Sequence, residues 1–160
     1  MNTENQPMND TRPTPRERAY SLMDSRLEDL RAFNSGDYDR EEIGEPEYYG
    51  LSLDMVEAGT FENQFPFIRF QISWGGPSEE FRFYSDGKAS FVFMDWGEFE
   101  EITLHSDDRE TVETFLMSDE FKSFGNSQYD HMIEYGKAMI KGFSTMEWAY
   151  GEYTPRGDEE

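Results

Sequence analysis

The sequence predicts an α+β fold, in which an antiparallel sheet of about four strands is packed by helices. A helical stripe of apolar residues occupies residues 14–36, and alternating strand patterns separated by turn residues fill residues 65–105. Hydrophobic residues make up only 36% of the chain, but aromatic residues make up 16%. Because each buried ring removes roughly 150–250 Å² from water, this aromatic content predicts a folded core.

The first helix is expected to begin at Thr14. Thr14 is a suitable N-cap, Pro15 suits the first helical position, and Glu17 completes a capping box. The segment Asn34-Ser35-Gly36 is expected to end the helix. Between these limits, apolar residues recur at helical spacing at Ala19, Leu22, Met23, Leu27, Leu30 and Phe33.

The segment that follows the first helix is harder to interpret. Residues 37–42 form a charge run that is expected to be solvated, and residues 48–55 are consistent with a short strand. Glycine and proline at Gly44, Pro46, Gly50 and Gly59 weaken any regular interpretation of this region.

Four strands are expected in the next forty residues. In the first of them, Ile68, Phe70, Ile72 and Trp74 alternate with polar residues, so these four side chains are expected on one face. The sequence Gly-Gly-Pro-Ser at residues 75–78 predicts a turn, and the Asp-Gly pair within residues 85–88 predicts a tight hairpin. The expected strands are Phe67–Trp74, Phe81–Tyr84, Phe91–Trp96 and Glu100–His105.

Two further helices are expected to close the domain. Ser106 or Asp107 would cap the first, which would end near Gly125 and carry Val112, Phe115, Leu116 and Phe121. Ser127 would cap the second, and the aromatic alternation that follows is consistent with a further strand or a flap. We therefore expect a disordered tail at residues 1–13, a single domain at residues 14–153 and a C-terminal tail at residues 154–160.

Residue types that carry common catalytic chemistry are scarce. The chain has no Cys, and its two His, His105 and His131, are isolated in the sequence. Adjacent carboxylates such as Glu79/Glu80 are expected by composition among 35 acidic residues. No calcium-loop or phosphate-loop pattern is complete. The sequence predicts a non-enzymatic protein with no catalytic residue, no cofactor and no bound metal.

The formal net charge is −21, and it is unevenly distributed. Residues 35–65 hold nine acidic residues and one basic residue, and residues 106–160 hold thirteen and five. This charge opposes direct binding to nucleic acid or to an anionic membrane, and it favours a basic protein partner. The sequence has neither an apolar run of membrane-spanning length nor a secretory signal at its start, which predicts a cytoplasmic protein.

The total charge also suggests how such a partner is bound. B-DNA carries one charge per about 1.7 Å of axis, so 21 charges correspond to roughly 36 Å of duplex. A globule of this length has a diameter of about 40 Å. We therefore expect carboxylates to pair with cations that normally hold phosphates, with aromatic residues as hot spots. The expected partner-binding residues are Asp37, Asp39, Glu41, Glu42, Glu45, Glu47, Trp148 and Tyr150.

The segment FQISWGGPSEEFRF, residues 70–83, resembles sequences of small acidic accessory proteins of phages and plasmids, among them anti-restriction and anti-CRISPR inhibitors. The resemblance is one of class and covers residues 18–105. It implies an inhibitor that occupies the basic nucleic-acid-binding groove of a host defence enzyme, and it assigns no functional residue. Three alternatives stay open: an immunity- or antitoxin-type protein that blocks a basic toxin nuclease, a carboxylate-based metal-dependent enzyme, and acidity that serves only solubility.

Overall fold

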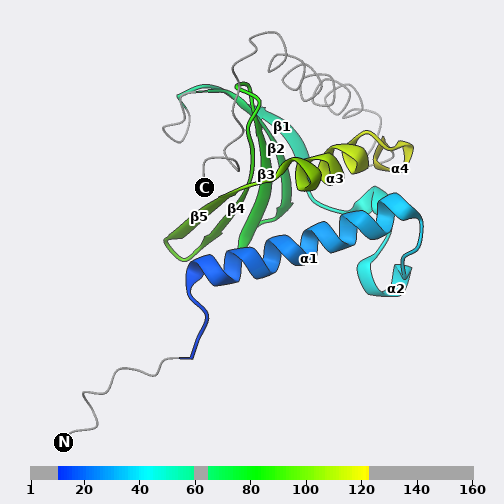
Figure 1. The fold of residues 1–160 in the computed structure, drawn as a ribbon, viewed down its shortest axis with the longest axis horizontal. Helices are drawn as coiled ribbons and strands as arrows, with labels where there is room; N and C mark the ends of the chain where they lie inside the picture. Colours follow the sequence, from blue (N-terminus) through cyan, green and yellow to red (C-terminus); the bar gives the residue numbers. More distant parts are fainter. Residues whose placement is uncertain (1–10, 60–64, 123–160) are drawn as a thin grey trace, which may run out of the picture.

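A computed structural model describes residues 11–59 and 65–122 of the protein (Figure 1). Five strands form one antiparallel sheet, in which each strand pairs with the next along the chain. The α+β prediction is confirmed, with five strands in place of about four. The strands are β1 Ser52–Val56, β2 Phe67–Ser73, β3 Ser78–Tyr84, β4 Ala89–Asp95 and β5 Glu98–Thr103.

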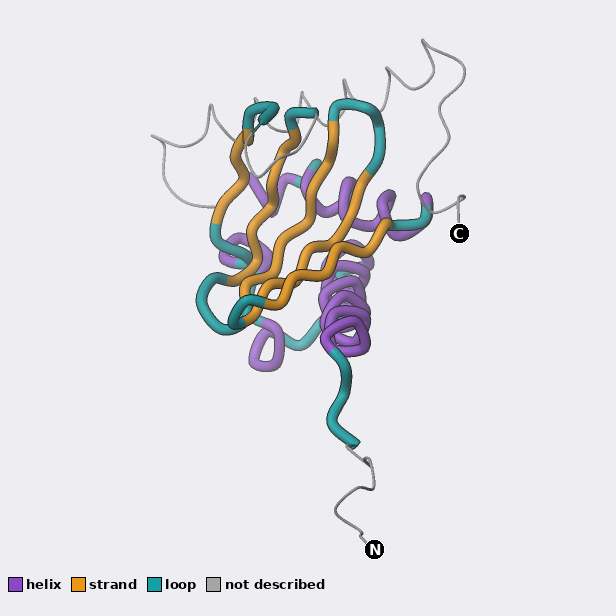
Figure 2. Tube along the Cα trace, turned by 90° about the vertical axis from the view of Figure 1, so that its left-hand side faces the viewer, coloured by secondary structure: helices purple, strands orange, loops and turns teal. Residues whose placement is uncertain are grey.

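Two helices, α1 (Pro15–Ser35) and α3 (Ser106–Leu116), cover one face of this sheet (Figures 1 and 2). The one-turn helix α2 (Arg40–Ile43) and the 3-10 helix η2 (Pro46–Tyr48) connect α1 to β1. A second one-turn helix, α4 (Asp119–Lys122), follows α3. No helix in the described ranges has both the length and the apolar character needed to cross a membrane.

Helix α1 begins and ends where the sequence predicts. The Thr14 hydroxyl accepts a hydrogen bond from the Glu17 backbone N–H, and the Glu17 carboxylate accepts one from the Thr14 backbone N–H. At the other end Gly36 adopts a left-handed conformation with φ 81°, and its N–H donates to the carbonyls of Ala32 and Phe33. Glycine takes this conformation without a steric penalty, so it stops the helix cleanly.

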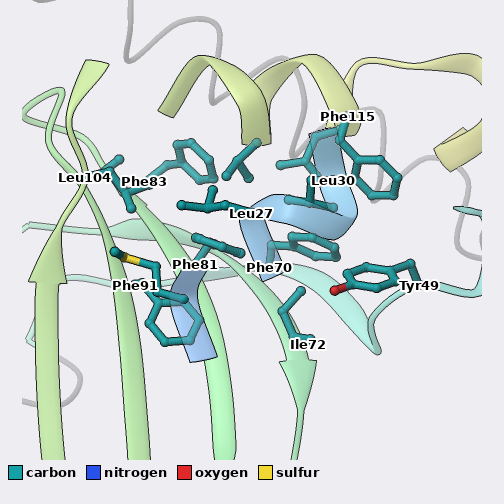
Figure 3. Packing of buried hydrophobic residues seen from close by; sticks show 14 of the residues in the cluster. Leu27, Leu30, Tyr49, Phe70, Ile72, Phe81, Phe83, Phe91, Leu104 and Phe115 are labelled. Atoms are coloured by element: carbon teal, nitrogen blue, oxygen red, sulfur yellow. The ribbon is translucent and has the colours of Figure 1, made fainter. Parts of the chain in front are cut away.

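The core lies between the helices and the sheet (Figure 3). Because side chains alternate along a strand, every second residue of β2, β3 and β4 points toward the helices. Phe81 packs edge-to-face on Phe91, with ring centroids 5.1 Å apart, and is stacked with Phe70 at 6.5 Å. Phe115 of α3 packs against Phe70 at 6.1 Å and thereby joins the helix layer to the sheet. Most of the buried aromatic residues belong to this cluster, and Phe67 and Tyr84 form a smaller one with Val56.

The predicted face is correct for three residues of β2 and wrong for the fourth. Ile68, Phe70 and Ile72 are buried in the core, whereas the Trp74 side chain is 71% exposed. The cause is a β-bulge between Gln71 and Ser73, after which β2 ends at Ser73. A bulge breaks the two-residue alternation, so Trp74 enters the turn instead of continuing the buried row.

The predicted helix that contains both Val112 and Phe121 is interrupted. Helix α3 ends at Leu116, and the Ser118 hydroxyl donates to the Phe115 carbonyl at 2.7 Å and accepts from the Phe121 N–H at 3.4 Å. A serine that bonds to nearby backbone groups competes with helix continuation, so the chain restarts as α4. Phe121 is nevertheless buried, as predicted.

The cap of α3 also differs from the prediction. The N-cap position is His105, whose side chain makes no capping hydrogen bond, in place of Ser106 or Asp107. The expected helix after Ser127 and the aromatic segment that contains Trp148 and Tyr150 lie outside the described residues, as do residues 1–10 of the expected tail.

Candidate protein-interaction surface

Most of the positive charge in the described part of the chain is paired within the molecule. Eight arginines form ion pairs with carboxylates of the same chain. Acidic residues far outnumber basic ones, so this pairing leaves a surface with a large excess of carboxylates. The paired residues are Arg16, Arg18, Arg26, Arg31, Arg40, Arg69, Arg82 and Arg109.

Four of these arginines lie on α1 and connect it to the sheet and to α3. The Arg18 guanidinium lies 2.5 Å from Asp95 Oδ2 and 3.4 Å from Glu98 Oε1, at the turn between β4 and β5. Arg16 pairs with Glu100 of β5 at 3.1 Å, and Arg31 pairs with Asp108 of α3 at 2.6 Å. These arginines of α1 thus pair with carboxylates of the same chain.

The fourth, Arg26, makes the most buried contact of the group. Its Nε and Nη2 atoms donate to the two carboxylate oxygens of Glu79 at 2.7 and 2.8 Å, and Glu79 is only 3% exposed. The hydrogen bonds from Arg26 to Glu79 raise the pKa of the guanidinium. The Ser73 hydroxyl lies 2.9 Å from Glu79 Oε2 and 3.1 Å from the Pro77 carbonyl oxygen. Arg26 thus helps to fix the turn between β2 and β3.

A second polar cluster lies on the sheet face opposite the helices. Glu80 accepts a hydrogen bond from Arg82 Nε at 2.7 Å, and both side chains are buried. The Tyr84 and Ser90 hydroxyls each donate to Glu101 Oε2 at 2.5 Å. Burial and the hydrogen bond to Glu101 raise the pKa of Tyr84. The carboxylates of this cluster are thus bound to neighbouring donors.

The adjacent acids that the sequence offers for acid–base chemistry are separated by the pleat of their strands. Glu79 faces α1, whereas Glu80 faces the opposite side. In the same way Glu100 pairs with Arg16, whereas Glu101 accepts from Tyr84. Within residues 11–59 and 65–122, no group of three or more potential metal-binding side chains is close enough to hold a metal ion.

The six predicted acidic residues lie together on the connection between α1 and β1, and we call them the acidic segment. The charge run contains a short helix, α2, in place of the expected solvated loop, because the Asp39 carboxylate caps it by accepting from the Glu41 N–H at 2.9 Å. One arginine in this segment, Arg40, lies 3.4 Å from Glu45. The four acids Asp37, Asp39, Glu41 and Glu42 are exposed, and Glu45 and Glu47 are half-buried. The predicted Trp148 and Tyr150 lie outside the described residues.

Sequence reasoning missed a second exposed feature, formed by Trp74 and Trp96, which we call the tryptophan edge. Trp96 is 95% exposed at the turn between β4 and β5. The meander places this turn at the same end of the sheet as the turn that carries Trp74. A methyl group added at Gly76 would lie 3.9 Å from Asp95 Oδ1, so the two turns are direct neighbours.

The backbone at Trp96 is unusual for a large side chain. Asp95 pairs with Glu98, so the hairpin loop consists of Trp96 and Gly97, with φ values of 46° and 84°. Two positive φ values define a type I′ turn, which favours Asn, Asp or Gly in its first position. A left-handed residue with a Cβ atom costs about 1 kcal/mol. In the sequence Asp95-Trp96-Gly97-Glu98, the glycine that follows Trp96 is the one signal that indicates a turn at Trp96.

In comparisons with known proteins, no protein-family model, curated protein or solved structure matches this chain significantly.

Proposed function

We propose that this protein is an acidic, non-enzymatic inhibitor that binds the basic nucleic-acid-binding surface of a nuclease or host defence complex. Its acidic segment would occupy the place of nucleic acid phosphates, and nucleic acid would thereby be excluded. A partner of this kind would place the protein in the cytoplasm. The observation that carries the proposal is the internal pairing of eight arginines, beside a net charge of −21.

The acidic segment is suited to this role by its anchoring as well as by its charge. The left-handed cap at Gly36 and the Asp39 cap of α2 set the path of the chain between α1 and β1. Tyr49, which follows the segment, is buried and packs edge-to-face on Phe33 of α1. Carboxylates held on an ordered backbone lose little conformational entropy when they pair with a partner's arginine or lysine side chains.

Net charge would act at longer range than these contacts. A strongly negative molecule accelerates its encounter with a positively charged groove, and this steering weakens as salt shortens the screening length. The same charge repels nucleic acid, so the protein and nucleic acid should compete for one surface of the partner without binding each other.

The test of this proposal is whether the protein and nucleic acid exclude each other from the partner. We would capture partners from a lysate of the organism that carries the chain, purify each, and measure binding of the protein with and without short duplex DNA or RNA. The proposal predicts that saturating nucleic acid displaces the protein and that the protein displaces nucleic acid. A partner that holds both ligands at once with unchanged affinities would contradict it. The identity of the displaced enzyme would separate a defence nuclease from a toxin nuclease.

A further inference from the structure

We propose that the tryptophan edge is the contact that recognises arginine side chains of the basic partner. This inference rests on the proposed function and adds to it a specific chemistry, the stacking of planar guanidinium groups on Trp74 and Trp96. Long-range charge attracts arginine and lysine alike, so an aromatic contact of this kind would give the protein a selectivity that charge alone lacks.

The first argument is the exposure of Trp96 in a strained position. The side chain is 95% exposed while its backbone has a φ of 46°. Trp96 therefore gains little from burial within the described fold, and its turn position favours smaller residues. Backbone strain that the fold does not need is typical of residues whose role is recognition.

The second argument is that both turns are held by ion pairs to α1. Arg18 contacts Asp95 and Glu98, which flank the Trp96 loop on either side. Arg26 contacts Glu79, and the Ser73 hydroxyl lies close to both Glu79 and Pro77, which follows Trp74 in the neighbouring turn. Turns anchored in this way lose little freedom on binding, and preorganisation of this kind favours affinity.

The third argument is the way in which other aromatic rings of this protein are used. Guanidinium groups lie over Phe93, Tyr49 and Phe67, with Arg-to-centroid distances of 5.0, 5.8 and 4.5 Å. No described cation lies over Trp74 or Trp96. Indole is the aromatic ring with the most favourable cation–π interaction, so the two exposed rings are open to a guanidinium from outside.

The net charge of the protein limits which kind of partner can bind the tryptophan edge. A second copy of this chain would bring another 21 negative charges to the interface, and a nucleic acid strand that could stack its bases on indole is repelled in the same way. A cationic protein surface is attracted. Among cationic side chains arginine is favoured, because its weakly hydrated planar group stacks on rings, whereas the lysine ammonium is a compact, strongly hydrated charge.

The test compares nona-arginine with nona-lysine as probes of equal charge. Isothermal titration calorimetry at fixed salt would be done on the full-length protein, on the double variant Trp74→Ala/Trp96→Ala, and on Tyr48→Ala. Tyr48 is a suitable control because it is also strongly exposed but lies on η2, outside the two turns. We expect the wild type and the control to bind nona-arginine about fivefold more tightly than nona-lysine. The double variant should bind both peptides with the nona-lysine affinity of the wild type.

Two results would overturn the inference. Equal affinity of the wild type for the two peptides would show that the protein does not select arginine. If the double variant still preferred nona-arginine, the preference would come from residues outside the tryptophan edge. Either result leaves the proposed function standing, because nona-lysine still binds. Failure of both peptides to bind the wild type would instead reject the electrostatic surface itself, and the inference with it. Trp96→Asn, which suits the type I′ turn, replaces the double variant if that variant does not fold.

Discussion

Trp96 shows at the level of one residue how local stability and the proposed function oppose each other. The type I′ turn of Trp96 and Gly97 reverses the chain between β4 and β5 in two residues. Asn and Asp tolerate the left-handed conformation because their short polar side chains bond locally, whereas a bulky indole gains nothing from it. The fold alone therefore favours a different residue at this position.

We predict that Trp96→Asn raises the free energy of unfolding by about 1 kcal/mol, because it relieves the left-handed strain. Urea denaturation followed by circular dichroism would measure the change. Trp74→Asn is the matched control, since Trp74 is not among the residues with positive φ and no gain is expected there. A variant less stable than the wild type would show that the Trp96 indole stabilises the folded chain, in conflict with the exposure argument.

At the scale of elements, α1 is held to the rest of the fold by an apolar stripe and by the ion pairs of its four arginines. Arg26 of α1 pairs with the nearly buried Glu79, whereas Arg40 of α2 makes a longer contact with Glu45 in an exposed segment outside α1. Breaking a buried pair leaves an uncompensated charge, whereas an exposed pair contributes little because water screens it.

We predict that Arg26→Met lowers the free energy of unfolding by about 3 kcal/mol. Arg40→Met, which also removes one arginine from a glutamate pair, should leave it nearly unchanged, because water screens this exposed pair. Thermal and urea unfolding of the two variants under the same conditions measure the difference. Equal effects would mean that the Arg26–Glu79 contact does not fix α1 on the sheet.

Tyr49 provides a pH-dependent test of the same junction. Its hydroxyl donates to Asp29 Oδ2 at 2.7 Å and accepts from Arg26 at 3.3 Å. Burial, together with the hydrogen bond to Asp29, raises the pKa of Tyr49 above its ordinary value of 10.0. The folded protein thus keeps a proton that the unfolded chain releases above pH 10, and the free energy of unfolding must fall as pH rises through this range.

We predict that above pH 10 the wild type loses stability faster than Tyr49→Phe, by about 1.4 kcal/mol for each pH unit. Unfolding in urea at several pH values between 9 and 11.5 provides the two slopes. Comparison with the Phe variant cancels the contributions of all other titrating groups. Parallel slopes would show that Tyr49 ionises normally in the folded protein.

The elements that could be predicted from sequence are those whose signals are local. The capping box at Thr14 and the stop at Gly36 depend on contacts within a few residues, so both ends of α1 are predicted correctly. The buried face of β2 follows from alternation as far as Ile72, whereas β3 is buried at every position, which alternation does not predict. The bulge before Trp74 depends on how β2 pairs with β3, which no local pattern records. The break at Ser118 depends on local hydrogen bonds that the apolar spacing of the helix does not reveal.

In the candidate surface, too, one part could be predicted from the sequence and the other could not. The acidic segment could be found from composition, because charge is written directly in the sequence. The tryptophan edge could not, because burial of large aromatic residues is the usual expectation and the exposure of Trp74 depends on where a bulged strand ends. The sequence pattern places Trp96 at the end of a strand, whereas it lies in the loop between β4 and β5.

At the scale of the whole molecule, the distribution of charge links the fold to the proposed function. Eight arginines pair with carboxylates of the same chain, and the surplus of carboxylates gives the molecule its net charge of −21. If the acidic segment docks in a basic groove, it should matter more for association than other exposed carboxylates do. If only total charge matters, the position of the neutralised residues will be irrelevant.

The most direct measurement is the association rate with the purified partner over a range of NaCl concentrations, for two variants with the same change in charge. One is Asp37→Asn/Asp39→Asn/Glu41→Gln/Glu42→Gln, in which the asparagine that replaces Asp39 still caps α2. The control neutralises four exposed carboxylates elsewhere, Asp24, Glu28, Glu57 and Glu110. We predict that the first variant associates more slowly, with a flatter salt dependence and faster dissociation than the control. Equal rates in the two variants, with tight binding that persists at high salt, would contradict the account.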